Sequence, residues 1–328
     1  MFDYIFQKFC NIFPHYIVRK NLFYKKIFYF FFCIFKFFLT KPIILNFKTF
    51  KLFAYPQKFD YSRFLLTRGD LPDPGELDFI KKNIKNKKTL LIDCGSNYGS
   101  YSIPLAAYSK KCDVYAFDAS RSVKKIFLRN FKLNNFKNIS YFNLAVGDES
   151  KTVIFKEDIF NNIIGSTGSG FVVNKVDNKI LCYKIKMVRL DNFFSSKKLS
   201  KYEFLFIKID LEGHDIKVIY GSLNIIKKIK TVIMFEFSKM IYNNDFKEKI
   251  FINFCNKNNL IITDLQLKQI SIKQLKNRLN SLDASHQTCG NYLIFHKKLI
   301  NYLADNMKSQ KERWPSGLRR PLGKRVYC

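Results

Sequence analysis

The stretch from Lys88 to Ser109, KTLLIDCGSNYGSYSIPLAAYS, decides the fold. Its first six residues, KTLLID, form a short apolar run that predicts a buried strand. The residues from Gly99 to Ser109 predict a helix, and Gly95 and Gly99 mark the turn before it. A strand, a glycine turn and a helix in this order begin a β-α-β unit, so the stretch predicts a parallel sheet.

The same alternation continues toward the carboxyl terminus. Apolar runs bounded by turn residues predict strands, and amphipathic stretches predict helices between them. Predicted strands cover 113–118, 138–144, 204–210, 231–237 and 291–296, two hairpin-like strands lie near 152–156 and 182–188, and predicted helices cover 120–134, 216–228 and 246–256. We therefore expect an α/β doubly wound sheet with helices on both faces, which binds ligands outside the carboxyl ends of its strands.

The glycine turn also limits the ligand, because a glycine there lets the backbone approach a bound molecule. A dinucleotide-binding fingerprint needs G-x-G-x-x-G, whereas this turn reads G-x-x-x-G with Asn97 in the place of the middle glycine. Asp93 ends the first strand, and Asp118 ends the next one, from where a carboxylate accepts hydrogen bonds from ribose hydroxyls. The pattern favours a nucleoside ligand without a pyrophosphate, although either aspartate could instead cap the following helix.

Composition divides the 328-residue chain into three parts. Residues 1–53 form a basic, aromatic arm with nine Lys or Arg against one acidic residue. Residues 54–300 are the expected main domain. Residues 301–328 are a tail that we do not expect to belong to the fold, because four of the eleven arginines and the single tryptophan crowd into residues 313–328.

The arm raises the question of a membrane. Its apolar run from Ile27 to Leu39 has thirteen residues, which as a helix rise about 20 Å against about 30 Å of hydrocarbon, too short to span. We expect a helix that lies on an anionic membrane face or one that packs on the main domain. The net charge of +31 suits a membrane or nucleic acid, yet only 11 of 57 basic residues are arginine, and the Lys-, Asn- and Phe-rich composition needs no binding partner to explain it.

The eight cysteines and four histidines carry no metal-binding pattern. There is no CxxC pair and no Cys/His cluster at zinc spacing, which predicts a reduced, cytoplasmic protein without a structural metal. His15, His286 and His296 have no partner pattern. The glycine-containing segment 165–170 is either a mobile loop over the site or a plain solvent loop.

Six short motifs, in this order and spacing, resemble the FkbM family of S-adenosylmethionine-dependent methyltransferases. They are Ile92 to Ser102 (IDCGSNYGSYS), Val114 to Asp118, Asn143 to Asp148 (NLAVGD), Arg189 to Asp191, Ile207 to Asp215 (IKIDLEGHD) and Ile233 to Phe237 (IMFEF). The resemblance covers residues 70–297. It implies a class I methyltransferase fold, a seven-stranded sheet whose last strand is antiparallel, and O-methylation of a hydroxyl on a saccharide or another secondary metabolite.

The resemblance also implies a cofactor site for S-adenosyl-L-methionine. The residues that would face its methionine and ribose parts are Asp93, Gly95, Ser96, Asn97 and Gly99. Asp118 would bind the ribose, and the loop from Ala145 to Asp148 would lie against the adenine. The family usually has Glu-Pro where this chain has Asp118-Ala119.

Carboxylates and an imidazole follow the strand predicted at 204–210, beside the expected methyl group. Asp210 and His214 are candidates for a general base, and Glu212 is expected to hold the loop or the acceptor. Asp210 could instead ligate Mg²⁺, an alternative that we do not favour. Glu236 could contact the acceptor or form a buried ion pair with Lys208.

Three functions remain open at this point. We expect a cytoplasmic O-methyltransferase acting on a saccharide of a surface glycan or glycolipid, with the arm at the inner face of the membrane. The alternative is an RNA methyltransferase, which the positive charge would suit. Against the RNA alternative, the strand predicted at 204–210 is not followed by an NPPY-like tetrapeptide, which is typical of amino methylation. No appended RNA-binding module is recognisable either. A second alternative is a non-catalytic interaction protein that keeps the fold.

Overall fold

The computed structural model describes residues 1–13, 22–56, 65–66, 71–157, 170–173, 181–194, 196–243, 246–282 and 288–308. Some features singled out in the sequence lie outside these ranges, namely His15, His286, Gly165, Gly168 and the arginine-rich residues 313–328.

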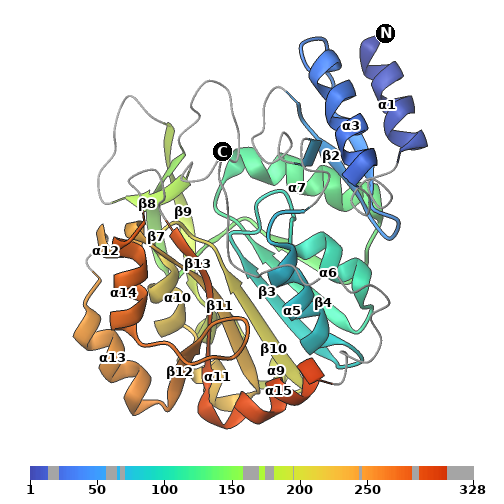
Figure 1. The fold of residues 1–328 in the computed structure, drawn as a ribbon. Coiled ribbons are helices and arrows are strands. Elements are labelled where there is room, and N and C mark those ends of the chain that lie inside the picture. The colour runs from blue at the N-terminus through green and yellow to red at the C-terminus, as the bar shows by residue number, and fades with distance from the viewer. Residues whose placement is uncertain are drawn as a thin grey trace.

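A seven-stranded sheet forms the centre of the molecule (Figure 1). Its strands lie in the order β12 (Leu260–Thr263), β13 (Thr288–His296), β11 (Thr231–Ser238), β10 (Phe204–Ile209), β3 (Thr89–Cys94), β4 (Cys112–Phe117) and β5 (Ile139–Phe142). Neighbouring strands are parallel except at β13, which runs antiparallel to both β11 and β12. This arrangement confirms the α/β, class I methyltransferase fold that the sequence predicts.

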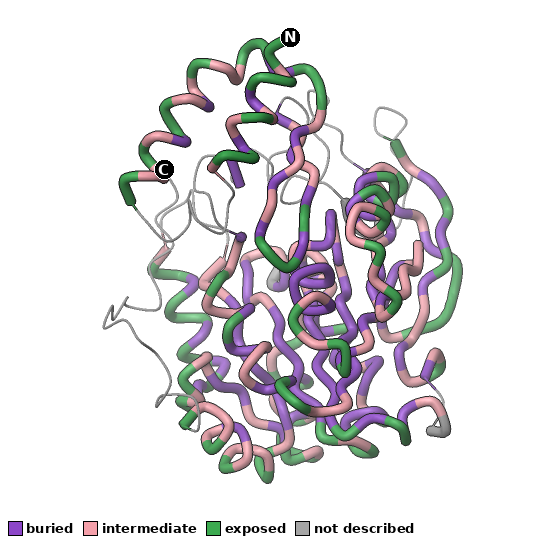
Figure 2. Tube along the Cα trace, turned by 90° about the vertical axis from the view of Figure 1, so that its right-hand side faces the viewer, coloured by how far each residue is buried: buried purple, intermediate pink, exposed green. Residues whose placement is uncertain are grey.

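Alternation along the strands builds two hydrophobic layers. In β10, Phe204 and Phe206 belong to one layer, whereas Leu205 and Ile207 belong to the other. Because successive side chains of a strand point to opposite faces, a continuous apolar run fills both layers. The sheet is therefore buried on both sides, as the purple trace through the centre of Figure 2 shows.

Helices cover both faces of the sheet. The first layer contains α5 (Pro74–Ile84), α6 (Ser102–Tyr108), α7 (Arg121–Asn134) and α15 (Ile300–Lys308). The second contains α8 (Leu190–Phe193), α9 (Ser196–Leu199), α10 (Asp215–Tyr220), α11 (Leu223–Lys228), α12 (Lys239–Asn243), α13 (Glu248–Lys257) and α14 (Ile272–Asn280), and the short η2 (Lys297–Leu299) precedes α15. The helix predicted over 216–228 is two helices, α10 and α11, which meet at Gly221 and Ser222.

A second sheet is inserted between β5 and β10. Its order is β6 (Ala145–Gly147), β9 (Leu181–Arg189), β7 (Lys151–Glu157) and β8 (Gly170–Val173). The antiparallel pairing of β7 with β9 confirms the two predicted hairpin-like strands. Ala119, in the loop after β4, packs in one small apolar cluster with Ala145, Phe155 and Tyr183 of this sheet. The inserted sheet therefore lies against the carboxyl end of β4, where a ligand is expected.

The arm forms two helices, α1 (Phe2–Ile12) and α3 (Leu22–Phe35), followed by the hairpin of β1 (Ile43–Asn46) and β2 (Lys51–Ala54). The two helices pack through aromatic rings, with the Phe28 ring centroid 5.9 Å from Phe6 and 5.6 Å from Phe9. Within the described ranges, no helix combines the length and hydropathy that a membrane span requires.

Strand β2 joins the arm to the main domain. The Asn134 side chain of α7 accepts a hydrogen bond from the Lys51 N–H and donates one to the Lys51 carbonyl, both at 2.7 Å. The Asn130 side chain accepts one from the Phe53 N–H, also at 2.7 Å. The predicted boundary at residue 53 therefore falls inside a strand that is bonded to α7, and the arm is continuous with the core.

Helix α15 corrects the predicted start of the tail at residue 301. Leu303 is fully buried, and the Tyr302 ring centroid lies 6.1 Å from that of Phe204 at the start of β10. Residues 301–308 are thus part of the fold. The unusual composition begins only after residue 312, so it gives no reason to exclude the helix before it.

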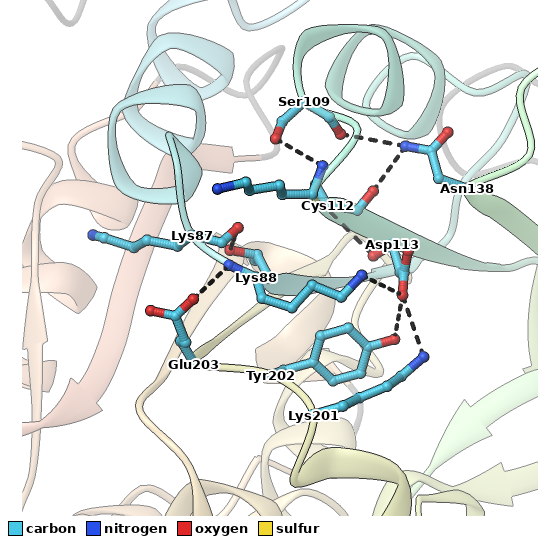
Figure 3. Close-up of polar contacts among 11 residues, drawn as sticks. Lys87, Lys88, Ser109, Cys112, Asp113, Asn138, Lys201, Tyr202 and Glu203 are labelled. Carbon is cyan, nitrogen blue, oxygen red and sulfur yellow. Dashed lines mark hydrogen bonds and ion pairs between the residues drawn. The ribbon is translucent and has the colours of Figure 1, made fainter.

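Polar contacts tie the strands together at their amino ends (Figure 3). Asp113, at the start of β4, accepts a hydrogen bond from the Tyr202 hydroxyl at 2.7 Å. Its carboxylate also lies 3.6 Å from the Lys88 ammonium group and 3.3 Å from that of Lys201. The Lys88 N–H donates to Glu203 at 2.9 Å. This network fixes the edge of the sheet opposite to the one where ligands bind in such folds.

Candidate active site

The carboxyl ends of β3, β4 and β10 meet at the glycine turn. The N–H groups of Gly95 and Ser96 donate to the Phe117 carbonyl at 2.9 and 3.0 Å, which fixes the turn to the end of β4. Gly95 has φ +82°, and a Cβ there would overlap the carbonyl oxygen of Asp210. Only glycine fits this contact. The close approach that requires Gly95 is therefore one between two protein backbones, whereas the sequence suggested an approach to a ligand.

Asp118 lies beside the turn and is partly buried. Its carboxylate accepts hydrogen bonds from the N–H groups of Asn97 and Ser120, both at 2.8 Å. Burial raises the pKa of Asp118 to about 7, although the two N–H groups oppose this rise. The cap of α7 is Ser120, whose Oγ accepts the Val123 N–H at 3.0 Å. Asp118 is therefore not the cap of α7. Each of its carboxylate oxygens has a further lone pair that can accept a hydrogen bond from a ligand hydroxyl.

Asp93 supports the turn from inside the protein. It is buried, and its Oδ2 accepts a hydrogen bond from the Ser102 hydroxyl in the first turn of α6 at 2.5 Å. Burial raises the pKa of Asp93 to about 6, while the Ser102 hydrogen bond and the Lys208 charge oppose the rise. Asp93 therefore couples the end of β3 to the helix that follows the turn.

Ser96 provides an observation that fits a polar ligand. Its Oγ is buried and has no hydrogen-bond partner among the described residues. Leaving a buried hydroxyl unsatisfied costs about 1–3 kcal/mol. A ligand with hydrogen-bonding groups at this turn would relieve that cost, as the nucleoside and amino-acid parts of S-adenosylmethionine would.

The predicted adenine loop is strand β6 and the residue after it. Ala145 is buried against Ala119, and Asp148, which follows the strand, is partly buried. The Asn143 side chain donates to the Asp118 carbonyl at 2.8 Å and so links the end of β5 to the loop after β4. The structure thus brings this segment next to Asp118.

Glu157 is a residue that the sequence reasoning missed. It is buried at the end of β7, where its carboxylate is hydrogen-bonded by the Ser120 hydroxyl and, at 2.7 Å, by the Tyr183 hydroxyl. The Tyr183 hydroxyl in turn accepts the Arg121 N–H at 2.9 Å. These contacts hold the loop that carries Asp118 to the inserted sheet. Because Glu157 is 37 residues from Ser120 in the chain, no local pattern could reveal the pairing.

Asp210 and Lys208 form the charged centre of the site. The Lys208 Nζ lies 3.4 Å from the Asp210 carboxylate, with the lysine side chain 1% exposed and the aspartate 36% exposed. Nζ also donates to the Ile209 carbonyl at 2.9 Å and to the Asn291 side chain at 3.3 Å. Burial opposes the charge on Lys208, yet nearby carboxylates, Asp210 foremost, raise its pKa overall. The signal for Lys208 is a lysine within an otherwise apolar strand, FLFIKI.

His214, the second base candidate, has different surroundings. Burial lowers the pKa of His214, and the Lys217 charge lowers it further, so the imidazole is held neutral and able to accept a proton. Its hydrogen-bonding neighbour is the backbone of Val172 in β8. His214 therefore faces the inserted sheet, whereas Asp210 faces Lys208.

Glu212 lies in the turn between these candidates, with φ +49°. Asp215, the first residue of α10, is buried and accepts the Glu236 N–H at 3.3 Å, and burial raises its pKa to about 6. The Glu236 charge is one of those that raise the pKa of Lys208. No three His, Cys, Asp or Glu side chains within the described ranges cluster as a metal site.

Comparisons with known proteins identify the family of the chain. A family model described as the methyltransferase FkbM domain matches residues 93–259. The chain is 33% identical over 100 residues to a tRNA/tmRNA (uracil-C(5))-methyltransferase from Campylobacter lari, covering 30% of this chain and 27% of that protein. It is 28% identical over 82 residues to a tRNA(Phe) (4-demethylwyosine(37)-C(7)) aminocarboxypropyltransferase from Methanocaldococcus jannaschii, covering 25% and 31%. The chain thus matches less than a third of either relative's length.

A solved structure, that of methyltransferase FkbM from Methylobacillus flagellatus KT, aligns with 14% identity and a TM-score of 0.32, over 72% of this chain and 52% of that one. The family match includes both the glycine turn and Asp210 and covers just over half of the 328 residues. The chain therefore belongs to the FkbM family and is an S-adenosylmethionine-dependent methyltransferase.

Proposed function

We propose that this enzyme methylates oxygen, at a hydroxyl of a saccharide in a surface glycan or glycolipid. The observation that carries the proposal is the partly exposed Asp210 carboxylate next to the glycine turn, with the buried ammonium group of Lys208 3.4 Å away. A neutral sugar hydroxyl is a poor nucleophile, and a positioned general base accelerates its reaction by about 10²- to 10⁴-fold. Asp210 has the location and the solvent access that such a base needs.

The residues around the turn suit the cofactor. Asp118 would accept the ribose hydroxyls, and the unsatisfied Ser96 hydroxyl would gain a partner. The Asp93 carboxylate complements a positively charged sulfonium group. When bound, the cofactor supplies an electrophilic methyl group. We assign five further residues to the cofactor site: Gly95, Asn97, Gly99, Ala145 and Asp148.

The chain's own contribution to the reaction is alignment and proton removal. A carboxylate oxygen of Asp210 accepts the proton of the saccharide hydroxyl during methyl transfer. The Lys208 ammonium group lies 3.4 Å from the Asp210 carboxylate and holds it in place before the reaction. His214 is the second candidate for this role, since its imidazole is neutral. Glu212 helps to position the acceptor from the turn between them.

An acceptor assay tests the proposal. The purified enzyme is incubated with S-adenosylmethionine that carries a radiolabelled methyl group, together with either a membrane glycolipid fraction or total RNA from the source organism. We expect the label to enter the glycolipid fraction and to resist ribonuclease. Label that enters only RNA would contradict the saccharide proposal.

RNA methylation is the second candidate function. Two observations favour it: the net charge of +31 and the local similarity to two tRNA-modifying enzymes. Neutralisation of RNA phosphates by lysines would make binding fall steeply with salt. The same acceptor assay decides between the candidates, because ribonuclease removes the label only if RNA is the acceptor.

We place the enzyme in a reducing compartment, the cytoplasm. The seven cysteines that the structure describes are all free thiols, and several of them, such as Cys94 and Cys112, are buried in the core. Structural disulfides are typical of oxidising compartments. Labelling of these thiols in the denatured, freshly isolated protein should therefore reach all of them.

Cofactor affinity is expected to fall as the pH drops through the pKa of Asp118, which lies at about 7. Above this pH the carboxylate is ionised and accepts ribose hydroxyls, whereas below it protonation removes the charge and weakens the acceptor. Titration with S-adenosylhomocysteine should show about tenfold weaker binding at pH 6 than at pH 8, the change in the ionised fraction.

The control for this pH profile is Asp118→Asn, which has no titratable group. It should bind more weakly at pH 8, by about 1.5–3 kcal/mol, and lose most of the pH dependence. A wild-type affinity that is constant between these pH values would show that Asp118 does not bind the ribose as a carboxylate.

A further inference from the structure

Exposed apolar side chains concentrate on the two amino-terminal helices, here called the apolar hairpin (residues 1–13 and 22–38). Of the fifteen large hydrophobic side chains that are exposed in the described part of the chain, twelve belong to this hairpin. Only Tyr108, Leu181 and Ile250 lie elsewhere. A monomeric protein rarely exposes so many apolar groups together, so this surface marks an interaction site.

Helix α3 shows why folding alone does not cover these groups. Its sequence, LFYKKIFYFFFCIF, is charged only at Lys25 and Lys26. Phe28 and Phe32 are buried against α1, whereas Phe30 on another face of the same helix is 61% exposed. A helix that is apolar all round is normally covered on every side. Within the described part of the chain, the side of α3 that carries Phe30 thus remains without protein cover.

The end of the hairpin projects from the molecule. Figures 1 and 2 both show the amino terminus at the extremity of the structure. Exposed Met1 and Phe2 lie there beside exposed Phe37 and Phe38, because the Phe2 and Phe38 rings stack at 4.6 Å. Phe37 is 76% exposed and carries the Lys36 ammonium group 4.8 Å from its ring centroid. Apolar groups with flanking cations are arranged here for an interface.

Charge identifies what this surface binds. Exposed lysines, such as Lys8 and Lys26, alternate with the apolar side chains. Among the described hairpin residues the one acid is Asp3, and its carboxylate accepts the N–H groups of Thr40 and Lys41 at 2.8 and 3.0 Å. A second copy of the chain would bring like charges together, whereas anionic lipid headgroups would attract each lysine by about 1 kcal/mol.

The helix lengths set the mode of binding. The 11 residues of α1 rise about 16 Å and the 14 residues of α3 about 21 Å, against about 30 Å of hydrocarbon. Helices of this length lie at the interface rather than across it. We propose that the apolar hairpin docks on an anionic lipid bilayer, with Phe30 and Phe37 entering the headgroup region and the lysines at the lipid phosphates.

Docking would also orient the site. Tyr302 of α15 packs on Phe204 at the start of β10, so α15 marks the amino ends of the strands. Figure 1 shows α15 at the opposite end of the molecule from the apolar hairpin. A docked chain would therefore hold the carboxyl ends of the strands, with Asp118 and Asp210, on the side of the molecule nearer to the bilayer.

Co-sedimentation of the full chain with vesicles tests the proposal. Vesicles contain either phosphatidylcholine alone or phosphatidylcholine with about 30% phosphatidylglycerol, at about 0.1 M and about 0.5 M salt. We expect at least about tenfold tighter binding to the anionic vesicles at low salt, and weaker binding at high salt. The double variant Phe30→Ser/Phe37→Ser should bind the anionic vesicles at least about tenfold more weakly than the wild type.

The matched control is Leu181→Ser/Ile250→Ser, which removes two exposed apolar groups outside the hairpin and should bind like the wild type. Circular dichroism melting curves show that each variant is folded. Equal binding by the wild type and the hairpin variant would overturn the proposal, as would absence of vesicle binding. A wild-type dimer that the hairpin substitutions convert to monomer, without vesicle binding, would identify a second copy as the occupant and would equally overturn it.

Discussion

Replacing Asp93 by alanine is expected to lower the affinity for S-adenosylmethionine by at least about 100-fold, measured by calorimetry. The carboxylate is buried, receives the Ser102 hydroxyl at 2.5 Å and opposes the buried charge of Lys208. Removing this carboxylate leaves the Ser102 hydroxyl without its acceptor and removes one negative charge near Lys208. Leaving a buried polar group unpaired costs about 1–3 kcal/mol, and the glycine turn that follows Asp93 is the segment that would shift.

The control for this loss is Asp113→Ala. It removes the same carboxylate from the amino end of β4, where Asp113 contacts Tyr202, Lys88 and Lys201 (Figure 3). This variant should be destabilised yet bind the cofactor like the wild type. The Asp93→Asn variant keeps the size and shape of the side chain but removes its charge, so comparing it with Asp93→Ala separates the effect of lost charge from that of lost packing. Wild-type affinity in a folded Asp93→Ala variant would show that Asp93 has no part in the cofactor site.

Replacing Asp210 by asparagine is expected to lower kcat by about 100-fold or more while cofactor affinity changes little. Asparagine keeps the size of the side chain but cannot accept the hydroxyl proton. The Asp210 carbonyl oxygen, which sits where a Cβ on Gly95 would clash, is unchanged by the substitution, so the turn should hold its shape. Steady-state kinetics on the identified acceptor give kcat, and calorimetry gives the cofactor affinity.

Two comparisons make the result for Asp210 decisive. His214→Ala should have the smaller effect if Asp210 is the base, and the larger one if the neutral imidazole is. If Asp210 ligates Mg²⁺ instead, EDTA should abolish wild-type activity and added Mg²⁺ should restore it. Unchanged turnover in both variants would mean that alignment of the reacting atoms alone accounts for catalysis.

The parallel sheet was predictable because its strands have the composition that burial on both faces demands. Runs such as FLFIKI in β10 and TLLIDC in β3 are apolar at successive positions, which suits a strand covered on both sides. Strand β12, with the four residues LIIT, was not among the predicted strands. The break between α10 and α11 lies at Gly221, where a Cβ would overlap the carbonyl oxygen of Gly147. Because Gly147 is distant in the sequence, no local pattern could predict this break.

In the site, too, features with a local sequence pattern were predictable, whereas contacts between distant segments were not. Asp93 and Asp118 could be placed together from the sequence, since each ends a strand and neighbouring parallel strands end at one edge. The partnership of Asp210 with Lys208 needs the burial of the lysine, and that of Ser120 with Glu157 needs the inserted sheet to fold back on α7. Both contacts depend on tertiary packing, and the one local signal for them is the lysine within the apolar run of β10.

The most direct test of the central claim is a calorimetric titration of the wild-type chain with S-adenosylmethionine and, separately, with NAD. The turn between β3 and α6, together with Asp118, fits a nucleoside without a pyrophosphate. The expected result is saturable binding of S-adenosylmethionine at one site per chain and no binding of NAD. Preferential binding of NAD, or no binding of S-adenosylmethionine by the folded chain, would contradict the account.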